Sequence, residues 1–294
     1  MHHNIPLAVV LAVVGSFCFA LAATVQHSAV RVQVDENTTK RRLNFRQIFK
    51  LLRDRRWWLG IGLMGVSLGC QILGLSMAPV SVVQPVGLLA FPWTVLLSHR
   101  TLGQDKGSVI RPTVVTVLAT LMFVLIFSTH AAPPSGDLDL IPVLVAAGIV
   151  YAVAALFTLL GSHGIRQWRC LLWASGGALF YGLEAALVRS LFEYAVGHVW
   201  WQSPIVWGII PALIIGSGLA GLMVQQGYAT GPANVVVASM TVTSPVVAVV
   251  TGVAVLGEGR LLTWPWDVAL IALAGVAIGG VVALARANHG SPGT

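Results

Sequence analysis

Charged residues are scarce in this chain: Asp, Glu, Lys and Arg make up 9% of its 294 residues. A typical soluble protein carries roughly 25% charged residues. So few charges cannot cover the surface of a soluble protein of this length. Most of the surface is therefore predicted to face lipid.

The sequence also lacks the patterns of common catalytic and metal sites. Its three cysteines, Cys18, Cys70 and Cys170, form no CxxC pair, which argues against a disulfide framework and a zinc site. No HExxH, GxSxG or GxxxxGK[ST] motif is present, so neither zinc chemistry nor ATP hydrolysis is supported. We therefore expect a protein that is not an enzyme and that has no cofactor and no metal site.

Long apolar segments, by contrast, recur along the whole chain. A helix of about 20 residues crosses the roughly 30 Å hydrocarbon core of a bilayer. Prolines and glycines separate the apolar segments. The pattern predicts an all-α membrane protein with a single transmembrane domain over residues 1–294 and about nine transmembrane helices. Their expected ranges are 5–29, 57–77, 80–98, 109–130, 140–161, 170–194, 204–226, 233–257 and 266–286.

Basic residues are concentrated between the first two predicted helices, where the loop 31–56 holds nine of the 17 Lys and Arg residues. Cytoplasmic loops carry the excess of Lys and Arg, so this loop is predicted to be cytoplasmic. Alternation then places 15 of the 17 basic residues inside, with Arg260 outside and Arg189 within a helix. We expect a multi-pass protein of the plasma (cytoplasmic) membrane with its N-terminus outside and its C-terminus cytoplasmic. The net charge of +7 then reflects topology, and no nucleic-acid partner is expected.

One segment of this loop has an amphipathic pattern. Between Asn44 and Trp58, the apolar residues Phe45, Ile48 and Phe49 are interspersed with Arg and Lys. This spacing predicts an amphipathic helix on the inner leaflet, with its basic face against anionic lipid. The alternative is a gate or a docking site for a partner.

The two halves of the chain resemble each other. Several prolines match at one offset of 153 residues: Pro79 with Pro232, Pro92 with Pro245, and Pro112 with Pro265. A second offset, of 162 residues, carries Phe19 onto Tyr181. We therefore predict two four-helix repeats, 5–130 and 170–286, joined by a linking helix at 140–161. Because matching helices are five spans apart along the chain, an odd number, the repeats are inverted, an arrangement typical of secondary transporters.

The repeated pattern also resembles a known family. An apolar helix, Ala-Pro or Gly-Pro, a second helix with a central proline, and then Leu-Gly-Gln or Leu-Gly-Glu occur at Ala78–Gln104 and at Gly231–Glu258. This pattern is similar to that of the drug/metabolite transporter (DMT) superfamily, and the nine-span count resembles its EamA-like and NIPA-type magnesium transporter-like branch. The resemblance implies the fold and a transport function but no substrate. Since the first copy ends in Gln104, a role for the family's carboxylate is available only at Glu258.

Glu184 lies near the middle of the sixth predicted helix, with no cation three or four residues away. An ionised carboxylate inside a membrane is costly, so Glu184 is a candidate for proton transfer during transport or for cation binding. The alternative is a protonated or hydrogen-bonded Glu that braces the bundle. Arg189 and Glu193, further along this helix, are expected to form a local ion pair.

Polar residues at membrane depth predict a substrate site. The third and eighth predicted helices carry polar residues on matching faces, and their prolines free backbone carbonyls that are tolerated where water or substrate can reach. The alternative for each residue is hydrogen bonding between helices. The predicted substrate-binding residues are Glu184, Tyr181, Gln71, Ser81, Gln84, Gln225, Asn234, Thr241 and Ser244.

Three functions remain open. The first is a secondary transporter that moves a small solute or lipid-linked metabolite by alternating access, with proton coupling through Glu184. The second is a magnesium or divalent-cation transporter, for which a single central carboxylate makes a sparse site. Further carboxylates are expected outside, at Asp137, Asp139, Glu193, Glu258 and Asp267. The third is a non-transporting membrane scaffold subunit. The expected partners are the substrate and membrane lipids, a homodimer is left open, and the high Ala, Val, Gly and Arg content indicates a bacterial source.

Overall fold

A computed structural model describes residues 5–34, 43–77, 86–102, 106–130, 140–197, 199 and 202–289. Within these residues the chain folds into α-helices and one short 3-10 helix. Their order is α1 (Ile5–Gln33), α2 (Phe45–Leu51), α3 (Arg55–Met77), α5 (Ala90–Leu102), α6 (Lys106–His130), α7 (Leu140–His163), α8 (Arg166–Gly197), α9 (Pro204–Thr230), α10 (Ala233–Leu256), η2 (Glu258–Leu261) and α11 (Trp264–His289).

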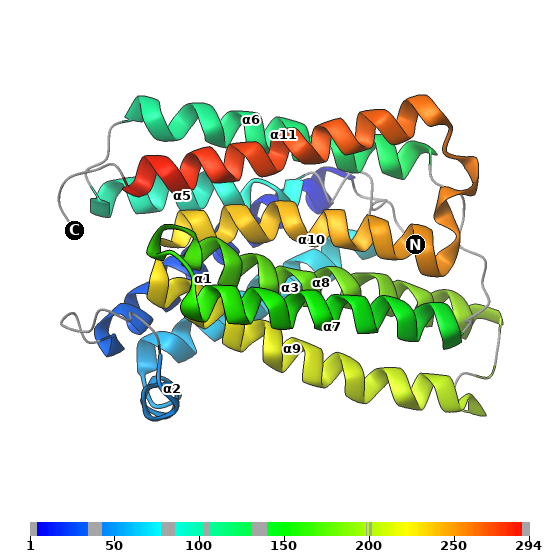
Figure 1. Cartoon of the computed structure of the whole chain (residues 1–294). Coiled ribbons are helices and arrows are strands. Elements are labelled where there is room, and N and C mark those ends of the chain that lie inside the picture. The colour runs from blue at the N-terminus through cyan, green and yellow to red at the C-terminus, as the bar shows by residue number, and fades with distance from the viewer. Residues whose placement is uncertain are drawn as a thin grey trace.

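Eight of the described helices are long and apolar enough to cross a membrane. They are α1, α3, α6, α7, α8, α9, α10 and α11, and they lie side by side along their lengths (Figure 1). Their outer faces are apolar too: Ile141 is 75% exposed and Ile271 73%. A helix that is apolar on all sides belongs in a membrane or a large protein core. This is the all-helical, multi-pass architecture that the sequence predicted.

The predicted third span, 80–98, falls partly outside the described residues, which omit 78–85. Its described part is α5, a helix of 13 residues. The described helices therefore include eight candidate spans. Helix α5 covers part of the one remaining predicted span, 80–98.

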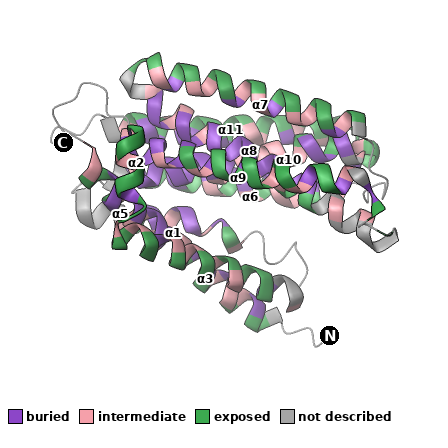
Figure 2. Ribbon diagram, turned by 90° about the horizontal axis from the view of Figure 1, so that it is seen from below, coloured by how far each residue is buried: buried purple, intermediate pink, exposed green. Residues whose placement is uncertain are grey.

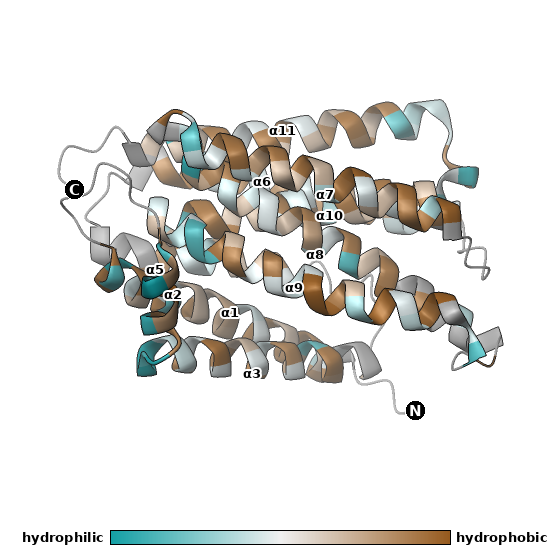
Figure 3. Ribbon diagram, turned by 60° about the horizontal axis from the view of Figure 1, so that its bottom comes forward, coloured by the Kyte–Doolittle hydropathy of each residue, from teal (hydrophilic) through white to brown (hydrophobic). Residues whose placement is uncertain are grey.

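Helices α8 and α10 form the centre of the bundle and pack closely against each other. Figure 2 shows their residues as largely buried, whereas α3 and α7 expose much of their length. Around this centre, α1 pairs with α3, α8 with α9, and α6 with α11. Hydrophobic residues also run along the outer surfaces of α7 and α9 (Figure 3), as lipid-facing helices require.

Glycines allow close approach in two of these pairs. A Cβ at Gly15 of α1 would lie 3.3 Å from the carbonyl oxygen of Ser67 in α3. A Cβ at Gly177 of α8 would lie 2.9 Å from the carbonyl oxygen of Ala220 in α9. Small residues at such crossings let helix backbones pack closely, which favours association inside a membrane.

The amphipathic helix is shorter than its pattern predicted. The segment from Asn44 to Trp58 contains α2, which ends at Leu51, and then the start of α3. Asp54 separates the two helices, because its Oδ1 accepts a hydrogen bond from the backbone N–H of Arg56 at 2.8 Å. A side-chain acceptor at this position satisfies an N–H that has no partner within the first turn of a helix.

Helix α2 lies across one end of the bundle (Figure 1), and the connection before it is tied to the second half of the chain. The Gln226 amide of α9 accepts a hydrogen bond from the Leu43 N–H and donates one to the Leu43 carbonyl, both at 3.0 Å. Both residues are buried. The C-terminal end of α11 lies at this same end of the bundle, and the start of α1 lies at the opposite end (Figure 3).

Candidate functional site

Two neighbouring cavities lie between the helices. The central cavity has a volume of about 660 Å³ and is lined by residues of α1, α3, α5, α8 and α10, with Gly87 and Leu88. The α2-side cavity has a volume of about 370 Å³ and is lined by residues of α1, α2, α3, α8, α9 and α10. Four residues line both cavities and are here called the wall: Phe19, Met64, Tyr181 and Met240.

Glu184 of α8 lines the central cavity. The Ser217 hydroxyl of α9 donates a hydrogen bond to Glu184 Oε1 at 2.9 Å. The neighbouring Gly216 leaves room for this carboxylate, since a Cβ there would lie 3.1 Å from the same oxygen. Glu184 is only partly buried, and Ser217, which lines the α2-side cavity, holds its carboxylate from α9.

Five of the nine predicted site residues line the central cavity: Gln71, Tyr181, Glu184, Thr241 and Ser244. They come from α3, α8 and α10, so the fold brings them together from distant parts of the sequence. Pro245 lines the same cavity. Because proline has no N–H, the Thr241 carbonyl lacks its usual helical donor at this depth. Such a carbonyl can be tolerated where it lines a cavity that water or substrate can reach.

Gln225 lies in the α2-side cavity instead. Its Nε2 donates a hydrogen bond at 2.9 Å to Oε1 of Gln26, which lies on α1 and is 2% exposed. The Gln26 Nε2 in turn lies 3.2 Å from Met64 Sδ. This amide pair joins the two halves of the chain beside the wall between the cavities.

Asn234 lines neither cavity, since it is buried at the start of α10, where its side-chain oxygen accepts a hydrogen bond from the Val235 N–H. Ser81 and Gln84 lie outside the described residues. The predicted ion pair of Arg189 and Glu193 also falls on side chains outside the described set.

Sequence reasoning missed several residues that line these cavities, most of them apolar. Phe19, Met64 and Met240 are typical of a hydrophobic core, and nothing in their identity distinguishes them from packing residues. Helix α1, by contrast, has a sequence pattern that could have pointed to its cavity-lining residues. Small, aromatic and polar residues that line the cavities recur there at steps of three or four, which places them on one helical face: Ala12, Gly15, Phe19, Ala23 and Gln26.

Charge is nearly absent from the cavity walls. Of the described residues that line either cavity, Glu184 is the only Asp, Glu, Lys, Arg or His. Within the described part of the chain, no group of three or more His, Cys, Asp or Glu is placed to hold a metal ion. Glu258, expected among the outer carboxylates, is buried at 1% exposure, whereas Asp267 is exposed. Asp137 and Asp139 lie outside the described residues.

These features define a class: an all-helical protein with the architecture of a multi-pass membrane protein and a cavity between its helices that carries several polar side chains in a mostly apolar lining. The chain is similar to an uncharacterized protein of Corynebacterium glutamicum, with 26% identity over 293 residues that cover 96% of each chain. No protein-family model matches the chain. No solved structure matches it either.

Proposed function

We propose that this chain is a secondary transporter of the drug/metabolite type, not an enzyme, that moves a small solute or lipid-linked metabolite across the plasma membrane. The observation that carries this proposal is the pair of neighbouring cavities that share the four lining side chains of the wall. Alternating access needs a site that opens to one side at a time, usually by rocking of two halves against each other. Movement of the wall residues would open the substrate site to one cavity and then to the other.

Packing between the helices supports the inverted repeat that this mechanism requires. The Gly15 contact with Ser67 and the Gly177 contact with Ala220 join residues that match at the two sequence offsets, 162 and 153. Phe19 and Tyr181, which also match at 162, both belong to the wall. We therefore assign α1, α3, α5 and α6 to the first repeat and α8 to α11 to the second, with α7 as the linking helix and nine spans in all.

The single carboxylate favours coupling to protons. Glu184 is the one carboxylic acid among the described lining residues, which include no Lys, Arg or His, and its equivalent in the first repeat is Ala22. A partly exposed carboxylate with one hydroxyl donor can lose or gain a proton without breaking an ion pair. Mg²⁺ is usually held by one or two carboxylates with retained waters, so a divalent-cation function has less support from this lining.

The orientation follows from the basic residues. Helix α2 and the C-terminal end of α11 share one end of the bundle (Figure 3), and the loop before and after α2 is the most basic segment of the chain. We propose that this end faces the cytoplasm, because short cytoplasmic loops carry the excess of Lys and Arg. The central cavity then lies on the outer side of the wall.

Transport assays in liposomes test the proposal. The purified protein is reconstituted with an internal pH dye and an internal Mg²⁺ dye, and a broad panel of solutes is added outside. The wild type is compared with Glu184→Gln, which keeps the size and the Ser217 contact but removes the charge. Asp267→Asn is the matched control, because this exposed carboxylate lies at the end of the bundle and lines neither cavity.

Solute-dependent proton flux in the wild type and in Asp267→Asn, with its loss in Glu184→Gln, is the expected result. Mg²⁺ flux without proton flux would favour the divalent-cation alternative. No flux of any kind across the panel would overturn the transporter proposal and favour a membrane scaffold.

A further inference from the structure

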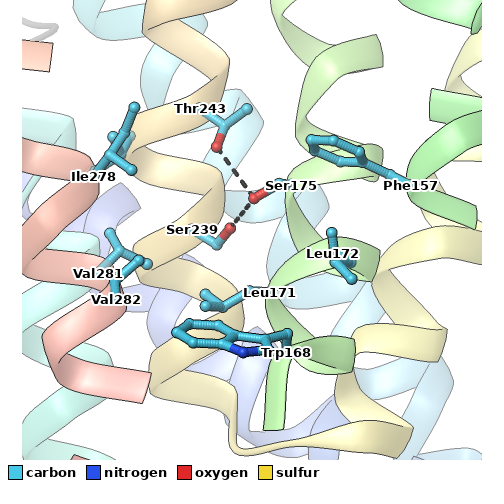
Figure 4. Close-up of a pocket in the computed structure, with 11 residues that line it drawn as sticks. Phe157, Trp168, Leu171, Leu172, Ser175, Ser239, Thr243, Ile278, Val281 and Val282 are labelled. Atoms are coloured by element: carbon cyan, nitrogen blue, oxygen red, sulfur yellow. Dashed lines mark hydrogen bonds between the residues drawn. The ribbon is translucent and has the colours of Figure 1, made fainter. Parts of the chain in front are cut away.

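A third hollow, here called the α8–α11 groove, has a volume of about 250 Å³ and is separate from both cavities. Residues of α7, α8, α10 and α11 line it (Figure 4). Most of them are apolar, and one edge is formed by Ile278, which is 48% exposed on the outer face of α11. The lining is as follows: Phe157, Trp168, Leu171, Leu172, Ser175, Ser239, Val242, Thr243, Ile278, Val281 and Val282.

The three hydroxyl groups in this groove already pair with one another. Ser175 and Ser239 hydroxyl oxygens lie 2.6 Å apart, and the Thr243 hydroxyl donates to Ser175 at 3.4 Å (Figure 4). Thr243 and Ser239 belong to α10, so these bonds also hold α8 against α10. Hydroxyls that satisfy each other place little demand on a ligand, so the groove behaves as an apolar surface.

A cation lies at one end of the groove. The Arg286 guanidinium carbon lies 5.5 Å from the ring centroid of Trp168, which lines the groove. Ile278, Val282 and Arg286 follow one another at steps of four along α11, so two apolar turns lead to the exposed cation. The neighbouring Arg169 cannot serve in its place, because it is buried and donates at 2.8 Å to the Gly161 carbonyl.

We propose that the α8–α11 groove binds one acyl chain of an anionic phospholipid, whose phosphate group lies against Arg286. The walls supply apolar contact for a chain, and the exposed guanidinium supplies a partner for a phosphate. A tryptophan and an arginine at one end of an apolar helix face are typical of the level of lipid headgroups. The volume is below the roughly 300–1,000 Å³ of common small-molecule pockets but accepts part of one chain.

The site is independent of the proposed transport function, because it shares no lining residue with either cavity. It also differs from the basic surface of α2, since it combines a recess with a single cation. Lipid binding at this groove requires that the protein is embedded in a bilayer, and it does not require transport.

Photo-crosslinking tests the site directly. A benzophenone amino acid replaces Ile278, which borders the groove, or Ile271, an exposed residue of the same helix outside the groove. Each full-length variant is reconstituted in bilayers of phosphatidylcholine with phosphatidylglycerol as the minor lipid. After irradiation, mass spectrometry measures the ratio of the two lipids among the protein adducts. The measurement is repeated with Arg286→Ala and with Arg286→Lys.

We expect phosphatidylglycerol adducts at position 278 to be enriched about fivefold over its share of the bilayer, the preference that about 1 kcal/mol per basic side chain provides. At position 271 the adducts should follow the bilayer composition. Arg286→Ala should remove the enrichment at 278, and Arg286→Lys should keep most of it. Equal lipid ratios at 278 and 271, or an enrichment that survives Arg286→Ala, would overturn the proposal.

Discussion

Gly182 of α8 gives the sharpest test of how the central helices pack. A Cβ at this position would lie 2.6 Å from the Ser244 carbonyl oxygen and 2.6 Å from the Val247 Cβ, both in α10. Neither atom is the end of a flexible side chain, so α8 and α10 would have to separate. Gly182→Ala is therefore expected to destabilise the protein, although alanine is the better helix former.

The magnitude follows from two opposing effects. Overpacking of a close contact costs about 1–3 kcal/mol, whereas replacing glycine by alanine inside a helix contributes about 1 kcal/mol of stability. The net loss for Gly182→Ala should therefore be up to about 2 kcal/mol. Gly275→Ala is the control, because Gly275 is exposed in the middle of α11 and a Cβ there would meet no atom within 4 Å.

Equilibrium unfolding in mixed micelles, followed by tryptophan fluorescence as denaturing detergent is added, measures both variants against the wild type. Gly182→Ala should unfold at a lower fraction of denaturing detergent, and Gly275→Ala at the same or a higher one. If Gly182→Ala proves at least as stable as Gly275→Ala, the close crossing of α8 and α10 is wrong.

Three further predictions concern two sets of hydrogen bonds between segments of the chain, and the wall. Gln226→Ala should lower the free energy of unfolding by about 1–3 kcal/mol in the same assay, because it leaves the buried N–H and carbonyl of Leu43 without their partner. Ser175→Ala and Ser239→Ala should each lower the free energy of unfolding by about 1 kcal/mol. The double variant should lose little more than either single variant, because the second change removes the hydroxyl that the first left unpaired. Additive losses would contradict the hydrogen bond between the two serines. Phe19→Ala should open a leak between the cavities, seen as solute efflux from liposomes that no longer depends on a proton gradient, whereas unchanged coupled flux would exclude Phe19 from the wall.

Much of the helical architecture was predictable, because it depends on length and hydrophobicity. The eight long helices follow the predicted spans, since roughly 30 Å of hydrocarbon requires a continuous apolar stretch whatever the tertiary packing. The break at Asp54 was not predicted. An amphipathic period continues across a turn without interruption, and only the hydrogen bond from the Arg56 N–H shows that Asp54 starts a new helix.

The candidate site was predictable only in part. Polarity at membrane depth identified Glu184, Gln71 and Thr241, which do line one cavity. Polarity could not say which cavity a residue faces, and a position on a helix fixes a side chain's direction only once its neighbours are known. Gln225 therefore lies in the α2-side cavity, and Asn234 bonds to the backbone of its own helix.

The tie between Gln226 and Leu43 joins a connection in the first half of the chain to a helix of the second half. If the halves rock, the amide must either release the backbone of Leu43 or carry α2 with it. If release of these hydrogen bonds costs about 1.4 kcal/mol, the ratio of the bonded to the released conformation changes tenfold. One glutamine can therefore determine the relative populations of the two conformations. A change of that residue would then alter the resting population of the molecule, and with it the apparent affinity for substrate, without touching either cavity's charge.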